Sequence, residues 1–198
     1  MTSEAEKDLT ERVRLIEAMM AEGRRKTENW GWSFVLWGVA YYVATAWATW
    51  GKSNWAWPVT MIAAGVITGV VASRMSHGQA ETTMGRAIGA IWASVGCTIF
   101  VLLMSLAYSG RYDTHVFVAI IGAMLGVANA ASGIILKWRM QFACAVVWLA
   151  SAVIACFSSD NVTSVDFLAA TFVGLIVFGV YAMICESRRR RQSGVAHA

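Results

Sequence analysis

Six long apolar stretches dominate the chain, and none of them contains a charged residue in its interior. A helix needs about 20 mostly apolar residues to cross the hydrocarbon core of a bilayer. Hydrophobic residues make up 58% of the 198 residues, and a soluble domain of this size could not bury so much apolar surface. We therefore expect an all-α integral membrane protein with six transmembrane helices, in residues 30–50, 57–74, 87–108, 116–136, 140–157 and 166–186.

The positions of lysine and arginine predict how these helices are oriented. All but two of the 16 lie in residues 1–29, in the second and fourth connections between spans, or in the tail at 187–198, and the exceptions are Lys52 and Arg111. Cytoplasmic segments of membrane proteins carry such an excess of cations. Both termini should therefore be cytoplasmic, and an even number of spans requires independently that they lie on one side.

Residues 1–29 form the only sizeable segment outside the apolar stretches, and their pattern predicts a cytoplasmic amphipathic helix. Ser3 and Glu6 have the spacing of a capping box, which satisfies backbone N–H groups at a helix start. Apolar residues at helical spacing form one stripe along it, and these are Leu9, Val13, Ile16 and Met20. Gly23 is expected to end this helix and to form an elbow before the first span.

Two groups of cations flank the spans and are expected to contact anionic lipid, where each cation contributes about 1 kcal/mol. They are Arg24, Arg25 and Lys26, and Arg188, Arg189, Arg190 and Arg191. The same lipid should repel the acidic start of the chain, so the first helix is predicted to lean away from the bilayer. Its stripe then needs a partner, either a second copy in a homo-oligomer or another membrane protein. Folding back onto the cytoplasmic loops is the alternative.

Asn129 is the most polar residue deep within a predicted span, and Ser132 lies three positions further along roughly the same face. An asparagine in a membrane usually forms a hydrogen bond to a neighbouring helix, worth about 0.6 to 2 kcal/mol. Alternatively, these two residues line a solute or ion path together with Ser94 and Thr98 of the third span. Proton coupling is not expected, because it normally requires an Asp, Glu or His inside the membrane.

Small residues four positions apart allow membrane helices to approach closely. Gly65 and Gly69 form such a pair in the second span, and Gly122 and Gly126 form one in the fourth. They indicate either an oligomer interface or packing between helices of one chain. Because paired glycines recur in the second helix of successive span pairs, we expect the six spans to form three helical hairpins.

Four tryptophans cluster at the outer ends of the first and second spans, and these are Trp47, Trp50, Trp55 and Trp57. Indole rings prefer the headgroup level of a bilayer, where the ring meets apolar chains and its N–H is hydrated. That is their expected role. An aromatic box for a cation or a lipid-like ligand is the alternative.

The chain lacks the patterns of several chemistries. It has no HExxH and no glycine-rich phosphate loop, and no span pairs a serine with a histidine or lysine that could activate it. We therefore expect no catalytic residue, no cofactor and no enzyme activity. Asp113, His115, Asp160 and Asp166 lie near the outer face, but isolated loop carboxylates are more often solvated or capping, so we expect no metal site. A nucleic-acid partner is not expected either, since it would need a basic stripe on a soluble surface.

The junction between the leader and the first span, AMMAEGRRKT followed by GWSFVLWGVAYY, resembles a loose group of small bacterial multi-span membrane proteins. The resemblance covers residues 15–45 and rests on a charged Met-Met-x-Glu-Gly-Arg-Arg leader that enters an aromatic first span. It implies a location in a bacterial inner (plasma) membrane. It transfers no catalytic or binding residues.

These features favour a non-enzymatic membrane protein that acts through helix–helix association and partner docking, as a scaffold or as a sensory or regulatory module. Residues 4–22 would then be the docking helix. The alternative is a small channel or facilitator for a neutral or lipophilic solute, with a path near Asn129.

Overall fold

The structure is a computed structural model that describes residues 2–53, 55–76, 83–111 and 113–195. Every regular element in these ranges is a helix, which confirms the all-α prediction. The helices are α1 (Thr2–Asn29), α2 (Gly31–Gly51), α3 (Ala56–Ser76), α4 (Thr83–Tyr108), α5 (Thr114–Ile135), α6 (Arg139–Phe157), α7 (Asp160–Thr171), η1 (Phe172–Val177) and α8 (Phe178–Val195). α7, the π-helical segment η1 and α8 follow one another directly and form one long helix.

Five helices are long and apolar enough to cross a membrane, which supports a membrane protein. They are Ala56–Met75, Thr83–Tyr108, Thr114–Ile135, Arg139–Phe157 and Asp160–Gln192. α2, which corresponds to the first predicted span, is not among them. Its four tryptophans and two tyrosines add N–H and O–H groups to the helix, and Ser33, Thr45 and Thr49 add hydroxyl groups.

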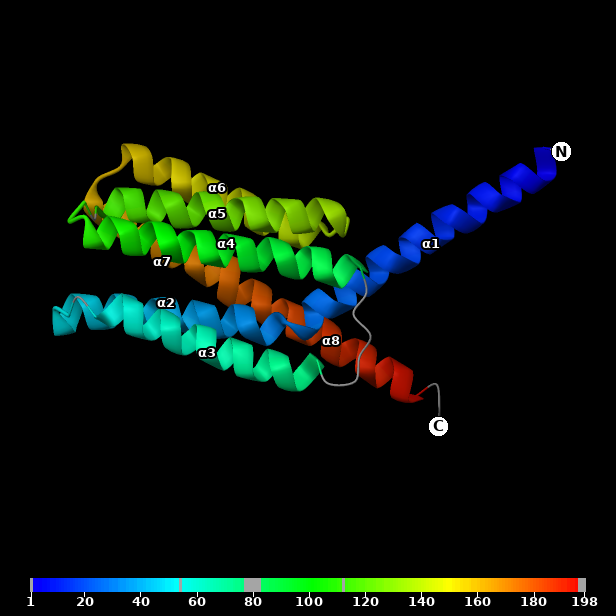
Figure 1. Cartoon of the computed structure of the whole chain (residues 1–198), viewed down its shortest axis with the longest axis horizontal. Helices are drawn as coiled ribbons and strands as arrows, with labels where there is room; N and C mark the ends of the chain where they lie inside the picture. The colour runs from blue at the N-terminus through cyan, green and yellow to red at the C-terminus, as the bar shows by residue number, and fades with distance from the viewer. Residues whose placement is uncertain (1, 54, 77–82, 112, 196–198) are drawn as a thin grey trace.

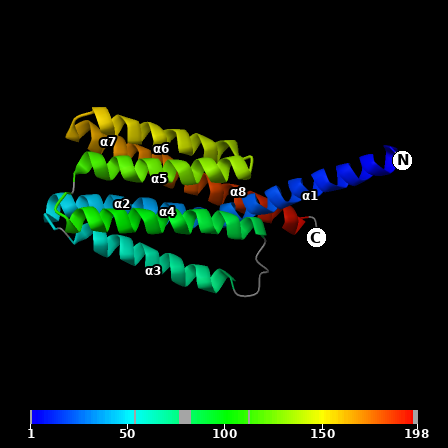
Figure 2. The same cartoon turned by 45° about the horizontal axis from the view of Figure 1, so that its top comes forward.

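The helices α2 to α8 run side by side as an elongated bundle, and α1 extends away from one end of it (Figures 1 and 2). The C-terminal helix ends on the same side, whereas the connections from α2 to α3, from α4 to α5 and from α6 to α7 lie at the opposite end. The end from which α1 extends carries Arg24, Arg25, Lys137, Arg139 and Arg189, and we call it the basic end.

α5 and α6 form the most closely packed pair of helices. A Cβ at Gly122 would lie 2.8 Å from the backbone oxygen of Trp148, and one at Gly126 would lie 2.7 Å from the Leu149 side chain. Glycine at these two positions therefore lets the helices approach, so this pair serves packing within one chain. The contact joins two of the three expected hairpins, because α5 and α6 correspond to the fourth and fifth predicted spans.

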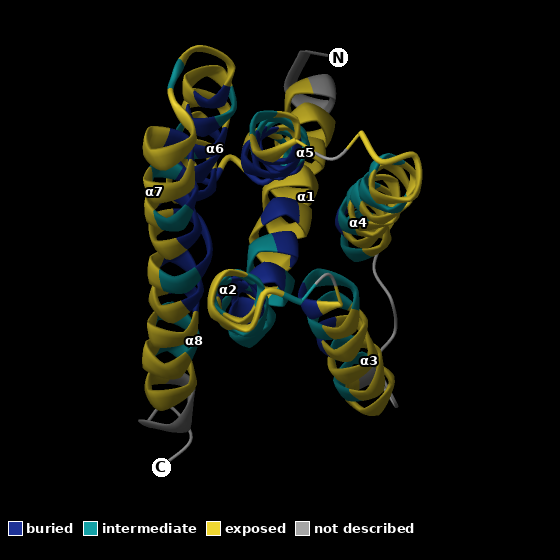
Figure 3. Cartoon of the chain, turned by 90° about the vertical axis from the view of Figure 1, so that its left-hand side faces the viewer, coloured by how far each residue is buried: buried dark blue, intermediate teal, exposed yellow. Residues whose placement is uncertain are grey.

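α3 and α4 lie at the edge of the bundle, and most of their described residues are exposed (Figure 3). A Cβ at Gly65 or at Gly69 on α3 would have no described atom of another helix within 4 Å. These two glycines therefore pack against no other helix in the described part of the chain. For Gly65 and Gly69 an interface between two copies of the chain stays a prediction. Lipid is the alternative neighbour of this face of α3.

Two predicted helix boundaries are wrong. α1 continues through Gly23 and ends at Asn29, so the elbow lies at Trp30 instead. Glycine at position 23 is explained by packing instead, because a Cβ there would lie 2.5 Å from Leu136 Cδ2. The last long helix begins at Asp160 rather than at Asp166.

The variants Gly122→Ala and Gly65→Ala should differ in their effect on stability. At Gly122 the new methyl group meets the Trp148 backbone and Ala152, so we expect a loss of about 1–3 kcal/mol from overpacking. At Gly65 it meets open space, and the higher helix propensity of alanine, worth up to about 1 kcal/mol, makes the change neutral or stabilising. Unfolding of both variants in detergent measures the difference, and equal effects would contradict the close contact of α5 with α6.

Candidate functional site

The C-terminal half of α1 is anchored at the basic end. Gly23 contacts Leu136, the residue that caps α5, and Met84 of α4. Arg24 Nε donates a hydrogen bond of 2.9 Å to the backbone oxygen of Leu136. Carbonyl groups at a helix C-terminus lack partners within the helix, and a cation there also interacts favourably with the helix dipole. α1 is therefore held across the end of α5.

A second anchor joins the last turn of α1 to α8. Glu28 is buried and forms an ion pair with Arg189, whose side chain is partly exposed. Burial raises the pKa of the Glu28 carboxyl, because its charged form loses hydration, and the guanidinium groups of Arg189 and Arg24 counteract part of that rise. The buried carboxylate consequently depends more on its partner than the hydrated arginine does.

The N-terminal half of α1 extends beyond the bundle and leaves most of the predicted docking stripe exposed (Figure 1). Leu9, Val13 and Ile16 have exposed fractions of 64%, 49% and 55%. Met20 is only 9% exposed, because α1 has reached the bundle at this position. The part of the stripe that is available to a partner is therefore Leu9, Val13 and Ile16, which we call the free stripe.

The turn between α5 and α6 holds a lysine in an unusual backbone conformation. Lys137 has a φ of 47°, in the left-handed region. The Trp138 amide donates to the Gly133 oxygen at 2.8 Å and the Lys137 amide to the Ile134 oxygen at 3.2 Å, which is the Schellman pattern of helix termination. Glycine is usual at this position, because a side chain costs roughly 1–2 kcal/mol there. The turn therefore keeps a cation in spite of that cost.

A cleft of about 520 Å³ lies at the basic end, between α1, the turn after α5 and α8. We call it the basic cleft. Its lining includes five cations and one acid, together with Trp138 and Tyr181. The cations are Arg24, Arg25, Lys137, Arg139 and Arg189, and the acid is Glu28. The sequence marks Arg24, Arg25 and Arg189 as lipid contacts. It contains no signal that brings Lys137 and Arg139 beside them.

The other cations predicted to contact lipid lie outside the basic cleft. Lys26 packs against α4, where its Cδ would be 2.7 Å from a Cβ at Gly85. Arg190 forms an ion pair with Glu186 within α8, and Arg190 and Arg191 border a separate hollow. Arg188 is exposed. The two cation groups are thus divided between several sides of the basic end.

The candidate path residues are not brought together. Asn129 and Ser132 are fully buried on α5, whereas Ser94 and Thr98 are exposed on α4. Asn129 Nδ2 donates a 2.8 Å hydrogen bond to the Leu125 oxygen of its own helix, not to a neighbouring helix as expected. Asn129 also lines neither of the two hollows at the basic end.

The four tryptophans at the opposite end do not share one environment. The Trp57 ring lies 4.6 Å from the ring of Phe117 and 5.7 Å from that of Tyr41, between ring centres, so it belongs to the aromatic core. Trp47, Trp50 and Trp55 are exposed. Headgroup contact stays the prediction for these three, while Trp57 has aromatic neighbours inside the bundle.

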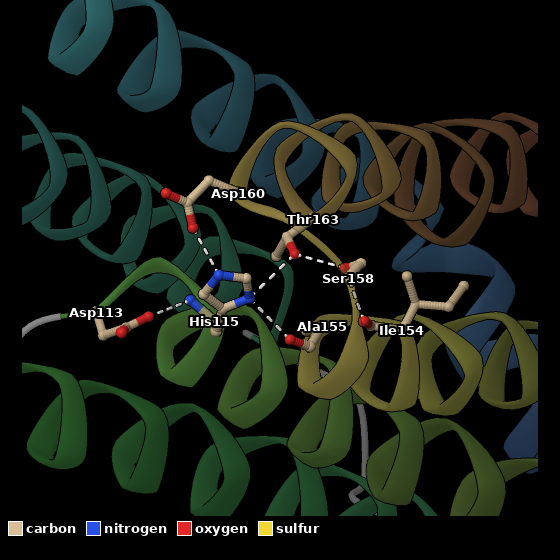
Figure 4. A network of polar contacts seen from close by, with 7 residues as sticks. All are labelled: Asp113, His115, Ile154, Ala155, Ser158, Asp160 and Thr163. Atoms are coloured by element: carbon tan, nitrogen blue, oxygen red, sulfur yellow. Dashed lines mark hydrogen bonds and ion pairs between the residues drawn. The ribbon is translucent and has the colours of Figure 1, made fainter.

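A polar network at the opposite end joins the starts of α5 and α7 to the end of α6 (Figure 4). His115 Nδ1 faces the Ala155 backbone oxygen at 2.8 Å, and Nε2 faces Asp160 Oδ1 at 2.5 Å. Both of these neighbours are acceptors, and only the doubly protonated ring donates at both nitrogens. Thr163 Oγ1 lies 3.2 Å from Nδ1 and connects the ring to Ser158. The network fastens three helix ends together.

The neighbouring carboxylates also have structural partners. Asp113 Oδ1 accepts a 2.6 Å hydrogen bond from the His115 backbone and so caps α5. Ser151 Oγ donates a 2.6 Å hydrogen bond to Asp166 Oδ2, which links α6 to α7. Among the residues that the structure describes, no group of three or more His, Cys, Asp or Glu side chains could hold a metal ion.

Comparison of the chain with protein-family models, with curated proteins and with solved structures finds no match. The resemblance of residues 15–45 to small bacterial membrane proteins stays a prediction. The basis for a function is therefore the geometry of α1 and of the basic end.

Arg189→Gln should destabilise the protein more than Glu28→Gln does. The first change leaves a buried carboxylate without its partner, and we expect it to cost about 1–3 kcal/mol near neutral pH. The second change leaves only a partly hydrated arginine and should be close to neutral. Chemical unfolding of the two variants in detergent compares these costs.

The difference should depend on pH in a defined direction. Because the pKa of Glu28 is raised in the folded protein, its neutral form favours folding, and that contribution is lost as the pH rises through the folded pKa. The loss of stability in Arg189→Gln should therefore become smaller as the pH is lowered. The double variant with Glu28→Gln should show no such recovery. A defect that is the same at all pH values would mean that Arg189 acts through other contacts.

Proposed function

We propose that the protein is a non-enzymatic membrane module in which α1 associates with α1 of a second copy of the chain. The observation that carries the proposal is the division of α1 into an anchored half and an extended half with an exposed apolar stripe. In this proposal the bundle spans an inner membrane six times, with α2 as the first span. The distribution of lysine and arginine supports a cytoplasmic position for both termini.

The free stripe has the spacing of a coiled-coil seam. Val13 occupies an a position of a heptad repeat, and Leu9 and Ile16 occupy d positions. Val13 at a with Leu9 at d is the combination that favours two strands in a parallel coiled coil. Copies inserted in the same orientation in one membrane also extend their α1 helices in the same direction. Both arguments favour a parallel pair.

Charged residues beside the seam are complementary in such a pair. Arg12 occupies a g position and Glu17 the e position of the following heptad, and residues in these positions face each other across a parallel coiled coil. Arg12, which contacts Asp8 at 3.0 Å within its own helix, would also meet Glu17 of the second copy. This complementarity favours a second copy as the partner.

The bundle compensates for the shortness of the seam. Helices shorter than about 12–15 residues are marginal in water on their own, but here the helix is continuous with its anchored half. Confinement of two copies to one membrane also raises their effective concentration. Gly65 and Gly69, which meet no other helix of the described chain, offer α3 as a second surface for close approach between bundles.

A channel or facilitator for a neutral or lipophilic solute is the second candidate. One observation favours it, since Asn129 Oδ1, Ser132 Oγ and both amide atoms of Gln141 are buried without a hydrogen-bond partner among the described residues. Such groups usually find partners. The close approach of α5 and α6 at Gly126 leaves little space beside them. Flux in vesicles that is unchanged by Asn129→Leu would exclude this path.

Ile16→Ala should weaken association of the full-length protein by about tenfold or more, because burial of an isoleucine side chain contributes about 1.5–3 kcal/mol. Leu15→Ala is the matched control, since Leu15 has a similar exposed fraction of 62% but occupies a c position, which faces away from the a and d seam. Resonance energy transfer between labelled copies in nanodiscs or vesicles measures the association of both variants. Equal effects of the two substitutions would show that the heptad seam is not the interface.

A charge reversal tests the parallel arrangement. Arg12→Glu places like charges opposite each other in the pair and should weaken association by severalfold, because a close exposed pair contributes about 0.2–1 kcal/mol and the contact occurs twice. Adding Glu17→Arg should restore it. Association of the double variant that stays as weak as that of Arg12→Glu would contradict the parallel register.

A further inference from the structure

We propose that the basic cleft binds a phosphate-bearing anion, of the kind that an anionic lipid headgroup presents. The cleft collects five cations and one carboxylate, and that carboxylate already pairs with Arg189. The cations come from three separate parts of the chain, namely α1, the turn after α5 with the start of α6, and α8. This convergence is produced by the fold and goes beyond a run of cations in the sequence.

Much of the positive charge in the cleft has no partner among the residues that the structure describes. No hydrogen bond or ion pair from the described residues involves the side chains of Arg25, Lys137 or Arg139. Glu28 is occupied by Arg189, and Arg24 donates to the Leu136 oxygen. Like charges that share a site raise each other's free energy, so a bound anion would relieve the repulsion and supply the missing acceptors.

The start of α6 gives a second, independent reason to expect an anion. Trp138, the N-cap residue of this 19-residue helix, makes no side-chain capping hydrogen bond, and Trp138, Arg139 and Met140 all line the cleft. The first backbone N–H groups of a helix have no acceptor within it. Together with the positive end of the helix dipole they form an anion site.

The chemistry of the lining favours phosphate over a single carboxylate. Guanidinium groups match the geometry of phosphate oxygens and can donate to them in pairs, and four of the five cations are arginines. A cleft of about 520 Å³ can accommodate a headgroup. Basic pockets between membrane helices at the cytoplasmic side bind phosphate headgroups, and the basic end faces the cytoplasm in the proposed orientation.

A bound phosphate would contact all three segments at once and would strengthen the anchoring of α1. This site does not depend on association of the free stripe. Ile16→Ala should therefore bind phosphate as the unaltered protein does, so that failure of one proposal leaves the other intact.

Lys137→Gly is the most informative variant, because it removes a cation while glycine suits the left-handed backbone at this position. We expect it to fold normally and to bind phosphatidylglycerol about fivefold more weakly, which is the effect of one cation beside an anionic group. Arg139→Gln should act similarly, and the double variant should lose more than either. Binding is measured on the full-length protein by native mass spectrometry from a neutral detergent, with phosphatidylcholine for comparison.

Arg86→Gln is the matched control, since Arg86 is an exposed cation in the first turns of α4 that does not line the cleft. Its affinity should stay within about twofold of the unaltered protein, because it removes the same charge outside the site. Equal losses of affinity for phosphatidylglycerol in Arg86→Gln and Lys137→Gly would overturn the site. They would mean that the cations attract anionic lipid only diffusely. Unchanged binding of phosphatidylglycerol in the double cleft variant would overturn it as well if soluble phosphate also gives no response that requires these two residues.

A second experiment with a soluble ligand identifies whether the phosphate comes from lipid or from a soluble compound. Inorganic pyrophosphate is added to the protein in neutral detergent, and the unfolding temperature is recorded for the same variants. A rise that requires Lys137 and Arg139, without selectivity for phosphatidylglycerol, supports the cleft and assigns it to a soluble phosphate compound. Selectivity for phosphatidylglycerol that requires both residues assigns it to lipid. The absence of both responses overturns the proposal.

Discussion

The contact of Gly23 with Leu136 determines how closely α1 approaches the apolar bundle. Because residue 23 has no side chain, α1 can lie across the end of α5, where Arg24 reaches the terminal carbonyl group. Glu28 then meets Arg189 at the next turn. A larger residue at position 23 would have to displace the side chains of Leu136 and Met84, which lie next to the hydrogen bond of Arg24.

The same helix serves two proposed purposes in its two halves. Its first half presents Leu9, Val13 and Ile16 to a second copy, and its second half forms one wall of the basic cleft. Separate residues of α1 carry the two interactions, so either of them can be lost without the other.

Some of these features are predictable from sequence and others are not. Apolar length predicts the helices, and the pair Gly122 and Gly126 marks a close helix contact correctly. Local patterns fail where a distant residue decides the outcome. The sequence predicts a helix end at Gly23 because glycine is a poor helix former. In the structure the helix continues, and glycine is needed there because Leu136 occupies the space of a side chain. Met20 continues the stripe by spacing and is buried by the bundle, while Lys137 and Arg139 reach the cleft only through the turn after α5.

The uninterrupted course of α1 from Thr2 to Asn29 also sets the direction in which its stripe faces. Successive residues of a helix are rotated by about 100° and rise about 1.5 Å. The residues between Ile16 and Gly23 therefore fix the rotational phase of the seam relative to the bundle, as well as its height above the membrane. One inserted residue would turn the seam by more than a quarter of a circle, whereas seven would return it to nearly its original direction at a greater height.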